Sequence, residues 1–398
     1  MSVLNAQGQG VAGRKIGLSA NPAGGVTITE TSSGSAVTNS LGQAHFIAKS
    51  TKIGLVVFTA TDVGNPALTA TAQVEFIQRR VVVFVQGIIA ELNDTTHTAD
   101  TVFPEIRQLL SDTGFSRPPN GTRETGKQCA NSLIDINHAD DDGDGVSDDG
   151  CPLILVYSYK DGHVSKTTGL WFPNPYDCID TSNKISASIH QLTSLLQEFT
   201  KQNPNTRFIL IGHSQGGLLV LQGAWSMTGS VPIDAVITLD GALGGAPRVG
   251  VDLTSLTCWG DPAASDLIDL WNSACSKHDS ATQCSNNHSH QGTTAIYHKQ
   301  DNFSIVASLQ AAGTKVFTIG SRDDCVWNPN KCHFSTNDNT SSQIVDNADN
   351  ATLLDLGGNC NVNFNPSLSC ISDSHSRVYK DSAVLNMIKT FIGSPTVP

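Results

Sequence analysis

Positively charged residues are scarce in this chain, and the scarcity argues against two classes of partner. Lysine and arginine together number 24 against 36 aspartates and glutamates, which gives a formal net charge of −12 at pH 7. A surface of this sign repels the phosphates of nucleic acids and the headgroups of anionic membranes. We therefore expect neither as a partner.

Long apolar runs are also missing. No stretch of 18 consecutive apolar residues occurs, so we expect no transmembrane helix. The first four residues lead directly into polar ones, so the beginning of the sequence lacks the pattern of a signal peptide. Hydrophobic residues nevertheless make up 39% of the sequence, which is enough for a buried core.

Cysteine is absent from residues 1–78, and all ten cysteines lie between Cys129 and Cys370. They form neither a Cys-x-x-Cys pair nor a regular zinc-ligand spacing. An even number of cysteines in Ser- and Asn-rich segments indicates disulfides and an oxidising compartment, whereas reduced cytosolic thiols are the alternative. We therefore expect a secreted or cell-surface protein, and a chain that has been shortened at its N-terminus.

Residues 1–78 read as a small all-β domain. Short β-rich runs alternate there with Gly-rich or Asn-Pro turns, a pattern typical of an antiparallel sandwich. The segment resembles the bacterial Ig-like domains of invasin-type adhesins, in Gln7–Gly13, Thr38–Ala44 and Phe58–Thr61. The resemblance implies a module that anchors or spaces, with no site of its own.

Residues 79–398 follow the pattern of an α/β domain. Five runs are apolar on both faces, as expected of strands buried in a mostly parallel sheet. They lie at 81–85, 153–157, 208–211, 235–239 and 315–319. An amphipathic stretch with apolar residues at helical spacing from Ile185 to Phe199 separates the second run from the third. Alternating strands and helices of this kind predict an α/β fold.

The sequence Gly212-His213-Ser214-Gln215-Gly216 matches the motif Gly-x-Ser-x-Gly. It follows the predicted strand 208–211 and precedes an apolar helical stretch, so it is placed as the nucleophile elbow of a serine hydrolase. A serine at a helix N-terminus also lies beside free backbone N–H groups, which can stabilise a developing oxyanion. We therefore expect Ser214 to be a nucleophile.

From this motif onward the chain resembles the α/β-hydrolases, and among them lipases and esterases with a Gly-His-Ser-Gln-Gly elbow. The resemblance covers residues 80–393, includes Ala235–Pro247, and implies a Ser-acid-His order along the chain. It places His375 as the base, on a loop ahead of a C-terminal helix. The acid would be Asp324, with the adjacent Asp323 and the earlier Asp240 as alternatives.

The same resemblance implies an oxyanion hole formed by the backbone N–H groups of Ile88 and Gln215. Lipases often carry His-Gly-x after the first strand of this domain, whereas this chain has Gln86-Gly87-Ile88. Gln86 is therefore a departure from the family pattern at the loop that supplies one donor.

Seven aspartates lie between Asp135 and Asp149 without any lysine or arginine among them. The insert at about 135–151 has calcium-loop spacing, because alternate side chains and one carbonyl can converge on a hard cation. A structural Ca²⁺ is predicted there, with a solvated acidic run as the alternative. The candidate ligands are Asp140, Asp142, Asp144, Val146, Asp148 and Asp149.

A further segment, at about 250–312, is long for a connection in this fold, so we expect either a cap over the site or a packed core of the insert itself. The sequence therefore favours hydrolysis of carboxylic esters through an acyl-enzyme, without an organic cofactor. An acyltransferase or amidase with the same triad is the first alternative. A non-catalytic adhesin that displays a decayed hydrolase domain is the second.

Overall fold

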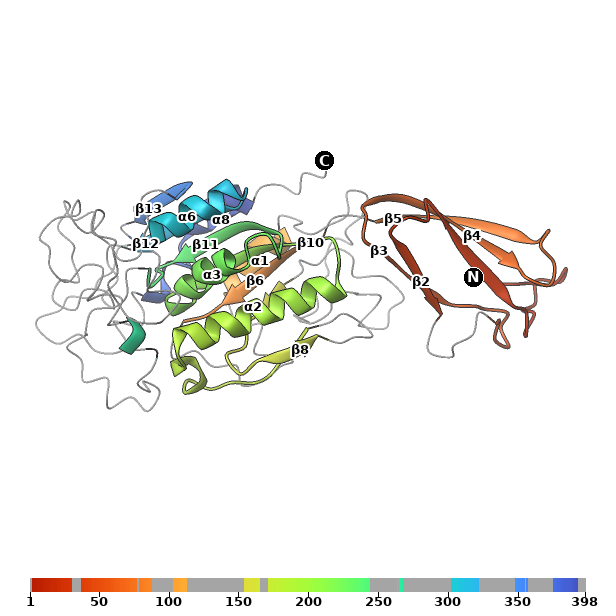
Figure 1. Cartoon of the computed structure of the whole chain (residues 1–398), viewed down its shortest axis with the longest axis horizontal. Helices are drawn as coiled ribbons and strands as arrows, with labels where there is room; N and C mark the ends of the chain where they lie inside the picture. Colours follow the sequence, from red (N-terminus) through yellow and green to blue (C-terminus); the bar gives the residue numbers. More distant parts are fainter. Residues whose placement is uncertain are drawn as a thin grey trace, which may run out of the picture. The chain divides into compact units, whose positions relative to one another are not determined.

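The computed structural model describes the two parts of the chain through residues 2–30, 37–76, 79–87, 103–112, 154–164, 171–243, 263, 265–267, 302–321, 348–354, 356 and 375–392. The chain divides into two compact units, Met1–Arg79 and Arg80–Pro398 (Figure 1). Within the described residues, none of the helices is both long and apolar enough to cross a bilayer.

The first unit contains two antiparallel sheets. One has the order β1-β4-β5, formed by Ile16–Asn21, Gly54–Asp62 and Thr69–Phe76; the other pairs β2 (Val26–Glu30) with β3 (Phe46–Ser50). Ile16 of β1 and Ala60 of β4 belong to one small buried cluster, against which Phe46 of β3 packs, so this cluster joins the two sheets. The antiparallel strands agree with the predicted all-β class. Its Ig-like nature stays a prediction.

The second unit is built on a six-stranded sheet of order β13-β12-β11-β10-β6-β7. Its strands are β6 (Arg79–Val85), β7 (Ile154–Val156), β10 (Thr206–His213), β11 (Ile233–Leu239), β12 (Lys315–Ser321) and β13 (Asn350–Leu354). The registered pairs β6–β7, β10–β11, β11–β12 and β12–β13 are all parallel. Because both faces are covered, the strands consist of nearly continuous apolar residues, and Val81–Val85 and Phe208–Ile211 are fully buried.

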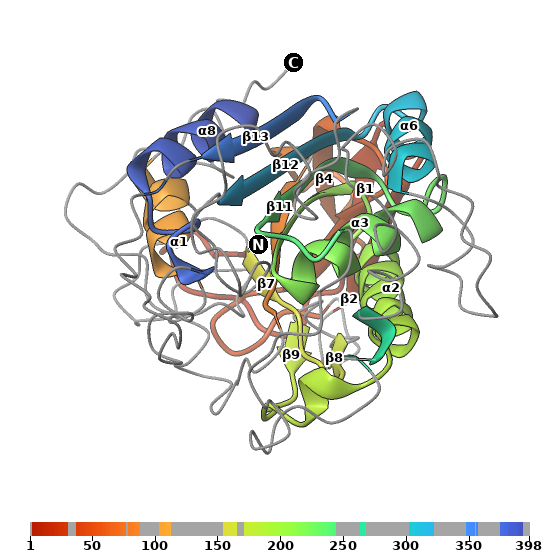
Figure 2. The same cartoon turned by 90° about the vertical axis from the view of Figure 1, so that its left-hand side faces the viewer.

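Helices cover both faces of this sheet, as Figure 2 shows, with α1 and α8 on one side and α2, α3 and α6 on the other. Their bounds are Pro104–Asp112 for α1, Ile185–Gln202 for α2, Gln215–Ser226 for α3, Asn302–Ala311 for α6 and Ser382–Ile392 for α8. Between β7 and α2 lie the short hairpin of β8 (Gly162–Val164) with β9 (Trp171–Pro173) and the 3-10 turn η2 (Asp180–Ser182).

Helix α6 lies within the segment that the sequence predicted as a cap. Its residues Ile305, Val306 and Leu309 are buried, and the helix packs on α3 and β12. Residues Asn302–Ala311 therefore belong to the helical layer of the sheet and not to a cap. Of residues 250–301, the structure describes only 263 and 265–267.

A parallel sheet gathers the carboxyl ends of its strands at one edge, where ligands bind in open α/β sheets. Ser214 follows β10 and Asp240 follows β11 at this edge. The six-stranded parallel sheet, its two helical layers and the strand–turn–helix at Ser214 together fit an α/β-hydrolase fold.

Candidate active site

Ser214 lies in the tight turn between strand β10 and helix α3. Its backbone has φ 57° and ψ −128°, and the positive φ lies in the left-handed region that residues other than glycine rarely adopt. Three hydrogen bonds maintain this conformation: Ser214 N donates to Leu239 O at 3.0 Å, while Gly217 N and Ala242 N donate to Ser214 O at 2.9 and 3.0 Å. A strained residue that is held from several sides is typical of a functional site.

The turn is possible only because glycines surround the serine. A Cβ added at Gly212 would lie 2.2 Å from Gly216 O, and one added at Gly216 would lie 2.2 Å from Val85 O. Gly87, which follows β6, is equally close to the serine: its added Cβ would lie 2.5 Å from Ser214 Cβ and 2.9 Å from Ser214 Oγ. The end of β6 therefore lies directly against the Ser214 side chain, as an oxyanion loop requires.

His375 lies beside the elbow. The ring of His213, the residue before Ser214, is 4.4 Å from the His375 ring between centroids. His213 Nε2 is also 2.9 Å from His375 O. Because a carbonyl oxygen only accepts, His213 must carry its proton on Nε2 and donate it. The structure thus brings the predicted base and the neighbour of the predicted nucleophile together from positions 162 residues apart in the sequence.

The His213 ring is enclosed by aromatic side chains. Tyr379 and Phe103 lie edge-on to it, at centroid distances of 5.0 and 6.3 Å. Burial lowers the pKa of His213 well below its ordinary value, and the nearby His375 ring lowers it further. His213 is therefore neutral at physiological pH, which lets it donate to the His375 backbone without placing a positive charge beside the predicted base.

This arrangement predicts a positioning role for His213 that can be measured. We expect His213→Leu, which removes the donor, to lower kcat toward an ester by about tenfold, because misplaced reacting groups lose rate steeply. His213→Gln keeps a donor near the Nε2 position, so we expect a loss of about threefold or less. Steady-state kinetics of both variants measure the difference, and equal losses would contradict the role.

The lowered pKa of His213 also makes stability depend on pH. The unfolded chain binds a proton at this histidine near pH 6.5, whereas the folded chain does not, so acid favours the unfolded state. Above about pH 6.5 the histidine is unprotonated in both states, so the free energy of unfolding is not reduced. As the pH falls below about 6.5, protonation of His213 in the unfolded chain lowers the free energy of unfolding. Between about pH 6.5 and 5, the free energy of unfolding should fall more steeply for wild type than for His213→Gln, by up to about 1.4 kcal/mol per pH unit. Urea unfolding at several pH values tests this, and parallel curves would refute it.

Among the three candidate acids, the structure describes only Asp240. This carboxylate is fully buried at the end of β11, on a residue with φ 44°. Its Oδ1 accepts a hydrogen bond of 2.5 Å from Ser321 N, and its own N–H donates to Ile319 O at 2.8 Å. Asp240 therefore ties the carboxyl ends of β11 and β12 together. Asp323 and Asp324 lie outside the described residues.

Of the two predicted oxyanion donors, Gln215 is described and Ile88 lies outside the described residues. Gln215 is the first residue of α3, where backbone N–H groups have no partner within the helix. Its side chain is fully buried, and its Nε2 donates to Thr181 O at 3.1 Å. The N-terminus of α3 is therefore fixed to the turn η2.

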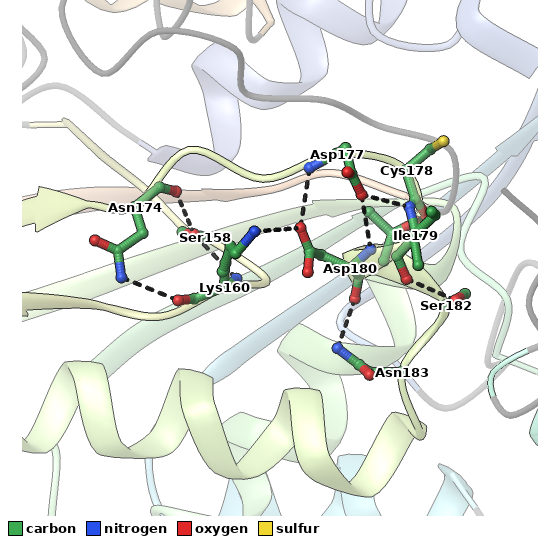
Figure 3. A network of polar contacts seen from close by, with 10 residues as sticks. Ser158, Lys160, Asn174, Asp177, Cys178, Ile179, Asp180, Ser182 and Asn183 are labelled. Atoms are coloured by element: carbon green, nitrogen blue, oxygen red, sulfur yellow. Dashed lines mark hydrogen bonds and ion pairs between the residues drawn. The ribbon is translucent and has the colours of Figure 1, made fainter.

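That turn is itself held by a network of polar contacts, drawn in Figure 3. Asp177 Oδ1 accepts a hydrogen bond of 2.9 Å from Ile179 N, and Asp180 Oδ2 accepts one of 3.1 Å from Asp177 N and lies 3.6 Å from Lys160 Nζ. Cys178, two residues before this turn, is disulfide-bonded. Polar contacts and a neighbouring disulfide therefore stabilise the turn that the Gln215 side chain binds.

Two tyrosines hold Gln86, the residue that departs from the family pattern. Tyr159 Oη donates to Gln86 O at 2.7 Å, and Tyr176 Oη donates to Gln86 Oε1 at 3.0 Å. The sequence interpretation did not include His213, Tyr159 or Tyr176 as site residues. For His213 a signal existed, since it lies inside the elbow motif; for the tyrosines, only the folded chain shows that they converge on Gln86.

The predicted calcium ligands from Asp140 to Asp149 lie outside the described residues. The Ca²⁺ site therefore stays a prediction, for which thermal melting with and without a chelator is the direct test. In the part of the chain that the structure describes, no group of three or more His, Cys, Asp or Glu side chains could hold a metal ion.

Comparison with known proteins gives structural similarity only. No protein-family model and no curated protein matches the chain. The phospholipase PlaB of Legionella pneumophila, solved in complex with thio-NAD, is 13% identical over 62% of this chain and 38% of its own, with a TM-score of 0.32. This chain thus spans well under half of the PlaB chain.

Two further similar structures are matched over most of their length. Est1E from Butyrivibrio proteoclasticus is 13% identical, with 85% of this chain and 95% of that chain covered and a TM-score of 0.35. The fluorophosphonate-binding serine hydrolase FphF of Staphylococcus aureus is 9% identical, with 95% and 99% covered and a TM-score of 0.36.

Proposed function

We propose that the second unit is a serine hydrolase that cleaves carboxylic esters through an acyl-enzyme, with Ser214 as the nucleophile. The observation that carries the proposal is the strained Ser214 at the β10–α3 turn, whose neighbour His213 contacts His375. A serine presented at a helix N-terminus beside a histidine is the arrangement that activates a hydroxyl for attack.

In the proposed reaction, His375 takes the proton of Ser214 Oγ while this oxygen attacks the ester carbonyl carbon. The carbonyl oxygen becomes an oxyanion, which the backbone N–H groups of Gln215 and Ile88 stabilise. His375 then gives its proton to the departing alcohol. Water, deprotonated by the same histidine, attacks the acyl carbon, and His375 returns the proton to Ser214 Oγ as the bond between this oxygen and the acyl group breaks. Asp324 would hold the histidine tautomer and stabilise its positive charge.

We also propose that the protein acts outside the cytosol and that its first unit is an Ig-like spacer or anchor. The cysteine pattern and the disulfide at Cys178 support the first part. The two antiparallel sheets of residues 2–76 support the second. Mass spectrometry of the protein from its native source, without added reductant, tests the location through its disulfides; free thiols throughout would contradict it.

A fluorophosphonate probe tests the nucleophile directly. We expect the probe to label wild type at Ser214, as read by mass spectrometry, and to leave Ser214→Ala unlabelled, because only an activated serine reacts. Ser226→Ala is the matched control, since Ser226 ends the same helix and bonds Gly223 O; it should be labelled like wild type. Equal labelling of Ser214→Ala and wild type would refute the proposal.

Product analysis distinguishes an ester hydrolase from an acyltransferase and from an amidase. With a p-nitrophenyl ester and a competing alcohol, we expect the free acid as the main product of a hydrolase. A new ester as the main product would identify an acyltransferase, and faster turnover of an anilide would identify an amidase.

A further inference from the structure

Gly87 lies against the side chain of Ser214, and the proposed mechanism does not say what holds its backbone in place. The residue must be glycine, because an added Cβ would lie 2.5 Å from Ser214 Cβ. Glycine is also the residue with the greatest backbone freedom. Gly87 therefore has no side chain that could fix the backbone beside the nucleophile. Its conformation must be fixed through a neighbouring residue.

Gln86 receives that restraint from two buried tyrosines. Tyr159 is 1% and Tyr176 is 3% exposed, and their rings pack edge-on at a centroid distance of 5.4 Å. One hydroxyl bonds the backbone oxygen of Gln86 and the other bonds its side-chain oxygen, at 2.7 and 3.0 Å. Both the backbone and the side chain of Gln86 are therefore held by hydrogen bonds.

The backbone contact has a direct geometric consequence. Gln86 O and Gly87 N belong to one planar peptide group, so a hydrogen bond to the oxygen fixes the plane from which Gly87 begins. The same oxygen is near the elbow, since a Cβ added at Gly216 would lie 2.5 Å from it. Burial raises the pKa of Tyr159 and of Tyr176 well above the ordinary value, so both hydroxyls remain protonated and can donate.

We propose that Tyr159 and Tyr176 are positioning residues that hold Gln86, and through it Gly87, against Ser214. The inference rests on the proposed function, because it assigns these tyrosines to the same reaction. At Gln86, where lipases often carry a histidine, the carboxamide oxygen accepts a hydrogen bond from the Tyr176 hydroxyl.

A third tyrosine provides the matched control. Tyr157 packs on Tyr159 at a centroid distance of 4.9 Å, but its hydroxyl lies 3.0 Å from Ser188 O and 3.1 Å from Gln191 Oε1, away from Gln86. Phenylalanine at each of the three positions removes one buried hydroxyl from the same aromatic cluster. The three variants should therefore lose similar thermal stability, whereas only two of them should lose rate.

The test is steady-state kinetics of the full chain with p-nitrophenyl acetate. We expect Tyr159→Phe and Tyr176→Phe each to lower kcat by about 5- to 20-fold, less than the loss of an oxyanion donor, with KM within about twofold. Tyr157→Phe should stay within about twofold in both. If wild type is active and all three variants have the same kcat, the positioning role is overturned while the proposed function stands. Inactive wild type would overturn both.

A double-mutant comparison separates positioning from packing. Gln86→Leu removes the oxygen that Tyr176 bonds, so Tyr176→Phe should cause no further loss of kcat in that background. Tyr159→Phe should still lower kcat there, because its partner is the backbone oxygen. Full additivity of Tyr176→Phe with Gln86→Leu would show that the Tyr176 hydroxyl acts independently of Gln86 and would overturn its role.

Discussion

Replacement of His375 with alanine is expected to lower kcat by about 10⁴- to 10⁶-fold toward a p-nitrophenyl ester, with little change in KM. A serine hydroxyl is a weak nucleophile unless an adjacent base accepts its proton. His375 contacts His213, the neighbour of Ser214, through both its ring and its backbone oxygen. We therefore expect the loss of the His375 imidazole to remove the base of the proposed reaction.

The control for this prediction is an exposed histidine outside the elbow motif. His190 lies on the exposed side of α2, so His190→Ala should retain the wild-type rate within about twofold. Circular dichroism of both variants shows whether the fold is kept. A folded His375→Ala protein that keeps a tenth of the wild-type kcat or more would contradict the assignment of His375 as the base.

Replacement of Asp324 with asparagine is expected to lower kcat by about 10⁴-fold. Asparagine keeps the shape of the side chain but cannot stabilise the histidine tautomer and its positive charge. Strand β12 ends at Ser321, three residues before Asp324, at the same edge of the sheet as Ser214. Because Asp240 Oδ1 holds Ser321 N, the segment that leads to Asp324 starts from a fixed point.

Two asparagine variants distinguish Asp324 from its alternatives. Asp323→Asn should retain kcat within about tenfold, because adjacent side chains point in different directions. Asp240→Asn keeps an oxygen that can accept from Ser321 N, so we expect a folded protein and a loss of kcat of about tenfold or less. If Asp323→Asn or Asp240→Asn loses more activity than Asp324→Asn, that residue is the acid and the assignment of Asp324 is wrong.

The sequence predicted the strands that are buried on both faces, because their composition alone separates them from their surroundings. The apolar runs at 81–85, 208–211, 235–239 and 315–319 are confirmed as parts of β6, β10, β11 and β12. Helix α2 was predicted from its apolar spacing and is confirmed. The strand–turn–helix around Ser214 is confirmed as well.

Strands β1 and β13 were missed for the opposite reason. β1 (Ile16–Asn21) contains a glycine and small or polar residues, and β13 (Asn350–Leu354) begins with an asparagine, an alanine and a threonine. Neither has the apolar run of a central strand. Their conformation depends on pairing, with β4 for the first and with β12 for the second. Such pairing joins distant segments and leaves little trace in local composition.

By itself, the sequence determined that one serine would stand at a sharp turn between a buried strand and a helix, since the glycines at 212 and 216 and the flanking apolar residues impose this locally. The tertiary structure alone decided which groups meet there. His213 forms a hydrogen bond with His375, which lies 162 residues later in the sequence. Tyr159 and Tyr176, from another part of the chain, both donate hydrogen bonds to Gln86. The physical reason is that these contacts depend on the order and register of parallel strands, which bring distant strand ends to one edge and are set by the packing of the whole sheet.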